Sequence, residues 1–509
     1  MSLPLSIPLW LPAAAALIGL FLPGAASRAL TILGALGTFA WTIWALIDFD
    51  RGAKGLQDAT DKMWIKPLGI HYKLGIDGLN LFLIILAAFI FLMCIVWASR
   101  REWRSPGQFF FFFGLAESAV LGALMAQDLA LFVLFFDLML LPFLFLTGIW
   151  GPESTRVAAI TKLFIYTLVG SLLMLAAAIA TGVLVAQQSG ADLSFAFSDL
   201  AAHPLGKGSQ EWIFLCFAAA FLVKMPAFPF HGWMPDGYGN MPLPVLAVFS
   251  AVLSKVAAYG FLRIVTPIFP DASAHFQDLM LVLALASILY GSAMAFTTTN
   301  TRLILGYSSI AQLGFIVLGI FSLSGDGAQG AVLQSVNHGL VVAPAFVIVA
   351  YLAERAGGSE DLRDMGGLAF RAPVLATLFL IVALANLAMP GSSNFAGEFL
   401  ILLGVFHTKL VICCIAFTGV AMAAVYSLRL FIRAMHNRVG PRVVSRDLSF
   451  GEGLVLVPLV AVIVALAFYP QIALHKGEPT ITRSVSAAGQ LAGGGQSQTA
   501  AAPSAQPTP

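Results

Sequence analysis

Five ionisable side chains of this 509-residue chain lie in segments that are otherwise apolar. They are Asp137 in LFFDLMLLPF, Lys224 in FLVKMPAFPFHGWMP, Lys255 in VLSKVAAYG, His338 in SVNHGLVVAP and Glu398 in SNFAGEFLIL. An ionisable residue inside an apolar segment is by default a functional candidate, because a charge in hydrocarbon is costly. Burial disfavours the charged form of a lysine and a nearby carboxylate favours it, so a buried lysine can gain or lose a proton when its partner moves. The chemistry that these residues permit is the transfer of protons or cations.

Each of the five residues also has a plainer structural explanation. Asp137 and Lys224 could form a structural ion pair, and Lys255 could extend its ammonium toward the membrane surface. Glu398 could cap the helix half that resumes after MPGSSN, because a carboxylate suits a helix N-terminus. His338, which we expect close to the beginning of its helix, could be a satisfied core histidine. As a set, groups of this kind at one depth would form a proton relay along the membrane plane.

The composition places these segments in a membrane. Of the residues, 59% are hydrophobic and 10% are charged, with a mean hydropathy of +0.90, whereas a soluble domain has about 25% charged residues. Apolar residues occur in about 14 runs of roughly 20 residues, the length that crosses about 30 Å of hydrocarbon as a helix. The sequence therefore predicts an all-α, polytopic membrane protein with about 14 transmembrane helices. The run at 3–22 lacks a preceding basic region, so we expect a first spanning helix rather than a cleaved signal.

Positive charges in the loops predict the orientation, because cytoplasmic loops carry an excess of Lys and Arg. One set of alternate loops contains thirteen such residues: Arg28, Arg100, Arg101, Arg104, Arg156, Lys162, Arg302, Arg355, Arg363, Arg371, Arg438, Arg442 and Arg446. With this set in the cytoplasm and an even number of spans, both termini lie outside, which for a bacterial inner membrane is the periplasm. The net charge of +2 points to no particular partner, and we expect no nucleic-acid binding.

Two of the predicted spans contain breaks. The segments KMPAFPFHGWMP and AMPGSSNFAGEF each interrupt an apolar run, and non-helical backbone survives at membrane depth only beside protein or a water-filled cavity. Broken helices in corresponding positions of two halves are typical of transporters built from inverted repeats. We therefore predict two inverted five-helix repeats, at about 109–265 and 277–434, within one membrane domain that covers residues 1–486.

Two segments outside the spans have other compositions. The loop 49–78 contains MWIKPLGIHYKLG, whose β-type residues and turn-prone glycine predict partly extended chain. Residues 487–509 are rich in Gly, Ala, Gln, Ser, Thr and Pro, which predicts a disordered tail. The four cysteines lie in apolar runs without metal-binding spacing, and no nucleotide-binding loop occurs. We therefore expect neither a metal nor a cofactor in this chain.

Several motifs resemble one known family. YKLGIDGLNLFLIIL, FFDLMLLPFLFLTGIWG, KMPAFPFHGWMPD, LGYSSIAQLGF, NHGL and, most specifically, MPGSSNFAGEFLILLG are similar to segments of the antiporter-like membrane subunits of respiratory complex I, of the NuoM type. The resemblance covers nearly the whole chain. It implies a proton-translocating subunit of NADH:quinone oxidoreductase that lies beside sibling membrane-arm subunits and lipids.

The resemblance also implies roles for the five residues. Asp137 and Lys224 would form the input half of a proton relay, Lys255 and His338 the link, and Glu398 the exit. Related subunits usually have lysine at the last position, so a glutamate there indicates the NuoM type. Quinone reduction, NADH oxidation, flavin and iron–sulfur clusters belong to other subunits of such a complex, which implies that this chain has no redox site.

The chain departs from the pattern of that family at four positions. Position 137 is usually glutamate, and the shorter aspartate must lie closer to Lys224 or reach it through water. Gln312 replaces a common histidine, Asn300 a usual aspartate and Asn240 a usual glutamate. The amide at 312 removes a titratable step near the middle of the relay, so water must bridge there or the proton route differs.

Three other functions fit the same residues. The chain could be a subunit of an Mrp-type or stand-alone cation/proton antiporter, the corresponding subunit of a membrane-bound hydrogenase or ferredoxin-linked complex, or a structural scaffold. Neighbouring genes and the composition of the purified complex would distinguish these functions. They would also identify the electron donor, while the choice between protons and sodium needs a transport measurement.

Overall fold

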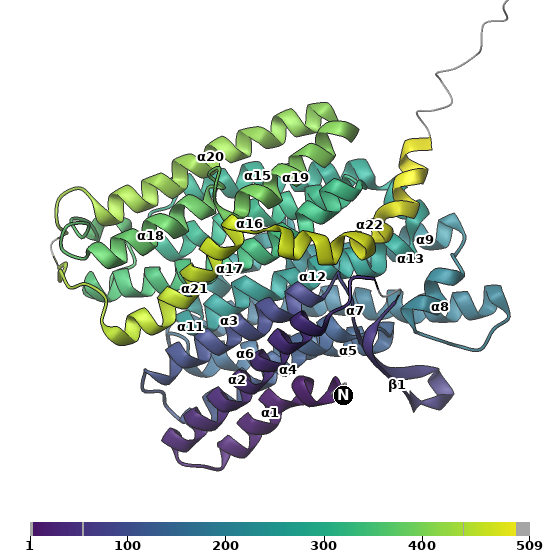
Figure 1. Ribbon diagram of the computed structural model, residues 1–509, viewed down its shortest axis with the longest axis horizontal. Coiled ribbons are helices and arrows are strands. Elements are labelled where there is room, and N and C mark those ends of the chain that lie inside the picture. Colours follow the sequence, from purple (N-terminus) through teal and green to yellow (C-terminus); the bar gives the residue numbers. More distant parts are fainter. Residues whose placement is uncertain (1–3, 53–54, 441, 495–509) are drawn as a thin grey trace, which may run out of the picture.

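The computed structural model describes residues 4–52, 55–440 and 442–494, and in these ranges the protein is an all-α membrane protein with one two-stranded sheet (Figure 1). Eleven of the described helices are long and apolar enough to cross a membrane. The all-α, polytopic fold predicted from the composition is confirmed. The total of about 14 spans, and the two inverted repeats, remain predictions.

Most of the chain forms one bundle of helices. In chain order these helices are α1 (Ser6–Leu20), α2 (Gly24–Asp48), α3 (Leu81–Ser99), α4 (Pro106–Met125), α5 (Leu129–Leu138), α6 (Leu140–Trp150), α7 (Arg156–Ser189), α8 (Phe197–Ala202), α9 (Lys207–Lys224), η2 (Phe230–Trp233), α10 (Met234–Asn240), α11 (Leu243–Val248), η3 (Phe249–Leu253), α12 (Ser254–Gly260), η4 (Phe261–Val265), α13 (Thr266–Ile268), α14 (Pro270–His275), α15 (Gln277–Thr297), α16 (Thr301–Phe321), α17 (Gly325–Arg355), η5 (Leu362–Asp364), α18 (Pro373–Asn386), α19 (Ser393–Thr408), α20 (Leu410–Met435), α21 (Phe450–Phe468) and α22 (Gln471–Gly494). The bundle positions the site residues, because each lies on one of these helices.

The extended chain predicted in the loop 49–78 forms a β-hairpin, which confirms that expectation. β1 (Gln57–Ile65) pairs antiparallel with β2 (Ile70–Ile76). The turn η1 (Lys66–Leu68) ends at Gly69, whose φ of 61° is a left-handed conformation that suits glycine. Asp128, the cap of α5, accepts a hydrogen bond from the backbone of His71 at 3.1 Å. The hairpin, which projects from one end of the bundle (Figure 1), is thus tied to it.

The centre of the bundle contains α16, α17 and the segment from α11 to α13. The most apolar part of α17 and of the segment 243–268 is buried throughout. The outer helices α7 and α20 instead expose apolar side chains such as Leu172 and Phe417, as helices that face lipid or a neighbouring subunit do. Lys255 and His338 belong to the central helices and therefore face protein.

Both predicted helix breaks are present. α9 ends at Lys224, and helical turns resume at Phe230, after two prolines that cannot donate backbone hydrogen bonds. The indole of Trp233 donates a hydrogen bond to the carbonyl of Val223, at 2.9 Å, and so satisfies one of the groups beside the break. The second break separates α18 from α19. Each break brings polar backbone into the bundle next to an ionisable side chain.

Two further segments depart from a regular α-helix, and the sequence indicated neither. α5 and α6 meet at Met139, two residues after Asp137. The π-turns η3 and η4 flank α12, which contains Lys255. Such π-turns within helices are frequent at functional sites. Asp137, Lys224 and Lys255 therefore lie beside irregular helix backbone.

The predicted disordered tail is wrong for residues 487–494, because α22 continues to Gly494. Ile481, Val485 and Ala488 lie on one face of α22 and are almost fully buried. This helix crosses the bundle and packs on α13, α14 and α17 (Figure 1). A few apolar residues on one face thus pack α22 against the bundle, although the overall composition of the segment is polar. The rest of that prediction, 495–509, lies outside the described residues.

Candidate functional site

Asp137 and Lys224 come together where two interrupted helices meet. Lys224, the last residue of α9, is 6% exposed, and its ammonium donates a hydrogen bond to the carbonyl of Phe136 at 3.1 Å. The ammonium also lies 4.5 Å from the centroid of the Phe136 ring, a cation–π distance. The carboxylate of Asp137 accepts a hydrogen bond from the hydroxyl of Ser171 on α7. The lysine therefore contacts the residue beside the aspartate, while neutral groups hold both charges.

Lys255 is buried in the centre of the bundle and has only neutral hydrogen-bond partners. Its ammonium donates to the carbonyl of Ser250 at 2.8 Å and to the hydroxyl of Ser254 at 3.2 Å. Ser250 belongs to the π-turn η3, so the irregular backbone supplies the acceptor that holds the lysine. Within the described residues, no carboxylate makes an ion pair with this ammonium.

His338 lies in the middle of α17, and the expectation that it is close to the beginning of its helix is wrong. The helix begins at Gly325, before its apolar run does. Within the described chain, neither ring nitrogen of this buried histidine has a hydrogen-bond partner. The next residue is Gly339, and a Cβ there would lie 2.8 Å from the carbonyl oxygen of Ala251 in η3. α17 therefore touches the element that holds Lys255, which brings the histidine beside the lysine.

Glu398 lies in α19, beyond the first turn after the break, and is 3% exposed. Its Oε1 accepts a hydrogen bond from Nε2 of Gln334 at 3.3 Å, and the same nitrogen donates to Oε1 of Gln312 at 2.7 Å. An amide of α17 thus holds the carboxyl group, in place of the N-terminal amides of its own helix. The helix-cap explanation does not describe this residue.

Many buried polar atoms around His338 and Glu398 have no hydrogen-bond partner in the ranges that the structure describes. They belong to Ser309, Gln312, Gln334, Asn337, His338, Ser392, Ser393, Asn394 and Glu398, which we call the polar seam. The seam lies between α16, α17 and the start of α19. An unsatisfied buried polar group costs roughly 1–3 kcal/mol, and buried water is the usual partner of such groups in proteins.

Two of the departures from the family pattern have structural roles. The side chain of Asn300 accepts a hydrogen bond from the backbone of Leu303 at 3.0 Å and so caps α16. Asn240 donates to the carbonyl of Asp236 at 2.8 Å and accepts from the hydroxyl of Thr155. An amide oxygen serves as a helix cap as well as a carboxylate does. These two replacements therefore act at helix ends rather than in the relay.

The sequence analysis missed two polar residues. Gln334 lies one helical turn before His338, so a search for polar residues at a spacing of four would have found it. Glu117 in α4 is 0% exposed, and across the described residues neither of its carboxyl oxygens has a hydrogen-bond partner. It lies in the apolar run FFFFFGLAESAVLGALM, so the criterion that selected Glu398 also applies to it.

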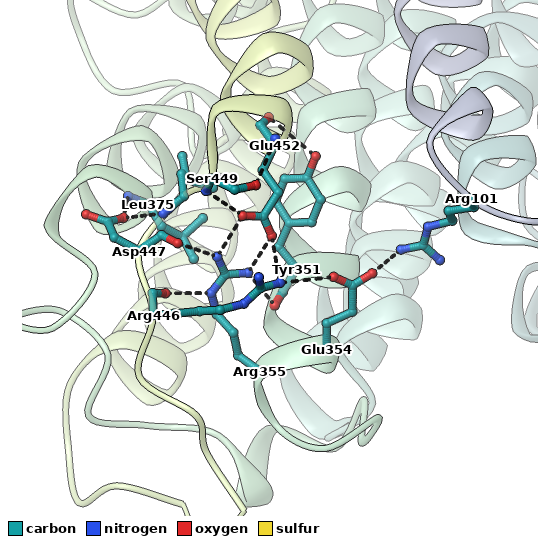
Figure 2. A network of polar contacts seen from close by, with 10 residues as sticks. Arg101, Tyr351, Glu354, Arg355, Leu375, Arg446, Asp447, Ser449 and Glu452 are labelled. Carbon is teal, nitrogen blue, oxygen red and sulfur yellow. Dashed lines mark hydrogen bonds and ion pairs between the residues drawn. The ribbon is translucent and has the colours of Figure 1, made fainter.

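An ion-pair network around the buried side chain of Arg355 holds the C-terminal end of α17, the helix that carries part of the polar seam (Figure 2). Arg355 is 1% exposed and donates to both carboxylate oxygens of Glu452 on α21, at 3.1 and 3.2 Å. Arg446 reaches the same carboxylate at 3.3 Å. Glu354 adds an ion pair with Arg101, in the loop after α3. The network therefore fastens α17 to α21 and to the end of α3.

Several of the helices that carry the candidate residues pack against one another. α12 packs against α9 and against α17, and α17 packs against α19. The helices that carry Lys224, Lys255, His338 and Glu398 are therefore neighbours in the bundle. Among the described residues, no three His, Cys, Asp or Glu side chains gather as a metal ion would require.

Comparison with known proteins gives consistent similarities. Residues 126–423 match the family described as NADH:quinone oxidoreductase/Mrp antiporter, transmembrane. The chain is 36% identical over 442 residues to NADH-quinone oxidoreductase subunit M of Escherichia coli strain K12, covering 86% of this chain and 85% of that protein. It is 33% identical over 496 residues to the subunit M of Rhodobacter capsulatus, covering 94% and 96%. A chain in the structure of respiratory complex I from Thermus thermophilus with bound NADH superimposes with a TM-score of 0.87 at 30% identity, covering 95% and 99%.

Proposed function

We propose, from the premise that this chain belongs to the NADH:quinone oxidoreductase/Mrp antiporter membrane family, that it is a proton-translocating membrane-arm subunit of an NADH:quinone oxidoreductase. Relatives at 33% and 36% identity are named as subunit M of that enzyme, and the complex I chain has the same fold. We place it in a bacterial inner membrane beside sibling antiporter-like subunits. The thirteen positive residues of one loop set, together with an even number of spans, support a periplasmic location for both termini.

The observation that carries the proposal is the buried ammonium of Lys224 at a helix break. Its contacts are a backbone carbonyl and an aromatic ring, and the carboxylate of Asp137 follows directly in the chain. An opposite charge nearby favours the ammonium form and its withdrawal favours the neutral amine. A small movement of either helix end therefore changes the proton affinity of the lysine, as a pump requires.

The relay that we propose then continues through the centre of the bundle. A proton released by Lys224 passes through water to Lys255, whose serine partners are neutral. His338 takes the proton from Lys255 and gives it to water in the polar seam. Glu398 receives it there and releases it on the exit side. Each step moves one proton between groups of this chain and water, so it needs no electron carrier.

We further propose that the redox chemistry takes place in other subunits. The relay residues hold protons only, and the sequence contains no nucleotide-binding loop or cysteine pattern for a cluster. The purified chain should therefore show neither flavin nor iron absorbance and should not oxidise NADH. A stoichiometric flavin or iron–sulfur cluster on the isolated chain would contradict this part of the proposal.

The experiment that tests the proposal compares two lysine variants of the whole complex in reconstituted vesicles. Lys224→Ala should lower proton pumping by more than about tenfold, because alanine cannot carry a proton and a positioned proton-transfer group contributes about 10²-fold or more. Lys207→Ala serves as the matched control, since this lysine lies on the same helix and is exposed. Subunit composition confirms assembly. Normal pumping by an assembled Lys224→Ala complex would overturn the role of Lys224.

A further inference from the structure

We infer that Gln334 is a positioning residue that holds one oxygen of Glu398 and so makes the other oxygen the atom that exchanges the proton. The inference rests on the proposed relay and adds to it a residue that does not titrate. It is based on the packing and the hydrogen bonds around the carboxyl group of Glu398.

Gln334 reaches Glu398 because α17 and α19 are in backbone contact. Gly397 precedes Glu398, and a Cβ at Gly397 would lie 2.9 Å from the backbone nitrogen of Gln334. Gly330 lies one turn earlier on α17, and a Cβ there would lie 2.6 Å from the backbone nitrogen of Ile401. Real Cβ contacts are longer than this, so the two glycines set the distance between the helices. The amide of Gln334 is therefore held beside the carboxyl group by backbone packing.

The orientation of the Gln334 amide follows from its two acceptors. Its Nε2 donates to Oε1 of Gln312 at 2.7 Å and to Oε1 of Glu398 at 3.3 Å. An amide oxygen only accepts hydrogen bonds, as does a carboxylate. The NH₂ group of Gln334 must therefore point toward both. The carboxylate of Glu398, which can only accept, fixes this orientation, and Gln312 presents its oxygen to the same NH₂ group.

The two oxygens of Glu398 differ as a result. Oε1 accepts the amide hydrogen, so a proton placed on Oε1 would face a donor and displace that bond. Oε2 is buried in the polar seam and has no hydrogen-bond partner in the described part of the protein. When Glu398 takes a proton from water, the O–H bond forms at Oε2 and the negative charge is lost. The same proton later leaves from Oε2 to water on the exit side.

Glutamine suits this role because its amide neither gains nor loses a proton near neutral pH. The Gln312–Gln334 pair keeps its direction while Glu398 cycles between its two forms. Gln334 and His338 lie one turn apart on the same face of α17. The fixed amide therefore directs Oε2 into the seam that the histidine also lines.

The test uses the infrared absorption of the protonated carboxyl group in the assembled complex. The carbonyl stretch of Glu398 is identified as the band that Glu398→Gln removes. Gln334→Met has a similar volume but no donor, so the band should move to higher frequency and pumping should fall by about tenfold, as expected for a hydrogen bond to a charged group. Gln329→Met, at a half-buried position on the same helix, is the matched control and should change neither quantity.

The outcomes separate the inference from the proposed function. If Gln334→Met leaves the band and the pumping unchanged while Lys224→Ala and Glu398→Gln stop pumping, the relay stands and the role of Gln334 is overturned. If the latter two variants pump normally, the relay itself fails. Should Gln334→Met fail to assemble, Gln334→Glu keeps the shape of the side chain and has at most one proton for two acceptors. An unshifted Glu398 band in that variant would equally overturn the inference.

Discussion

The two ends of the proposed relay hold buried ionisable groups in different ways. Around Asp137 and Lys224, the helices are interrupted, and a carbonyl, an aromatic ring and a hydroxyl hold the charged groups. In the polar seam, α16 and α17 are regular, neutral amides hold one carboxyl group, and other polar atoms of the described seam lack protein partners. In the proposed relay, the first region would change its charge when a helix end moves. The second would depend on amides that stay in place.

The largest effect is expected when Glu398, the one carboxyl group of the polar seam, is replaced. Glu398→Gln removes the acid and should lower proton pumping by well over about tenfold, because an amide cannot carry the proton. Glu398→Lys should restore part of the activity, since a buried lysine also exchanges a proton. Both variants are compared in reconstituted vesicles after assembly is confirmed. Pumping at the parental rate by Glu398→Gln would move the exit of the relay to another residue.

The next largest effect is expected at Asp137, where the charge and the length of the side chain can be changed separately. Asp137→Asn removes the charge that Lys224 senses and should lower pumping several-fold, to about tenfold, since a nearby charge changes proton affinity by one unit or more. Asp137→Glu keeps the charge and should be tolerated. The ratio of protons pumped to electrons transferred measures both. Equal activity of the Asn and Glu variants would show that Ser171, rather than Lys224, is the functional partner of this side chain.

A smaller effect is expected when a titratable side chain is added to the polar seam, which makes it more like the region around Lys224. Gln312→His introduces a group that titrates near neutral pH beside Gln334. The pH profile of pumping should acquire a new inflection near neutral pH, with less than about a twofold change at its optimum. Gln329→His, at a half-buried position on α17, serves as the control. An unchanged profile for Gln312→His would mean that no proton passes this position.

The smallest effect lies outside both regions and should leave the comparison intact. Asp447 accepts hydrogen bonds from the amides of Val374 and Leu375, at 3.0 Å each, and so caps α18. Burial raises the pKa of Asp447. Hydrogen bonds from backbone amides together lower this pKa by a larger amount, so it lies below its usual value. Its stabilisation is therefore present above about pH 4, the range of an unfolded aspartate, and is lost as the pH falls through the lower folded value.

Asp447→Asn should accordingly destabilise the protein by about 1 kcal/mol at neutral pH, because Asn has one acceptor oxygen and one of the two backbone amides loses its partner. The difference in melting temperature between variant and parent should shrink as the pH falls below about 4. Proton pumping should be unchanged. A difference that stays constant with pH would show that the charge of Asp447 does not stabilise α18.

The sequence by itself determined the class of the fold and most of the candidate residues. Long apolar runs can satisfy their backbone in a membrane only as helices, so the composition alone predicts the polytopic bundle. Prolines after Lys224 and the PGSS segment before Glu398 predict the two breaks, because both prevent regular backbone hydrogen bonds. These signals are local, and local chemistry is what a sequence displays directly.

Only the tertiary structure decided which groups touch. The contact of Lys224 with Phe136, the approach of α17 to α19 at Gly397 and the pairing of Gln312 with Gln334 join residues that are far apart in the chain. The π-turns beside Lys255 and the helix from 487 to 494 also escaped prediction. Each depends on how well a helix fits against its neighbours, and a close fit depends on where glycines and side chains of distant segments meet.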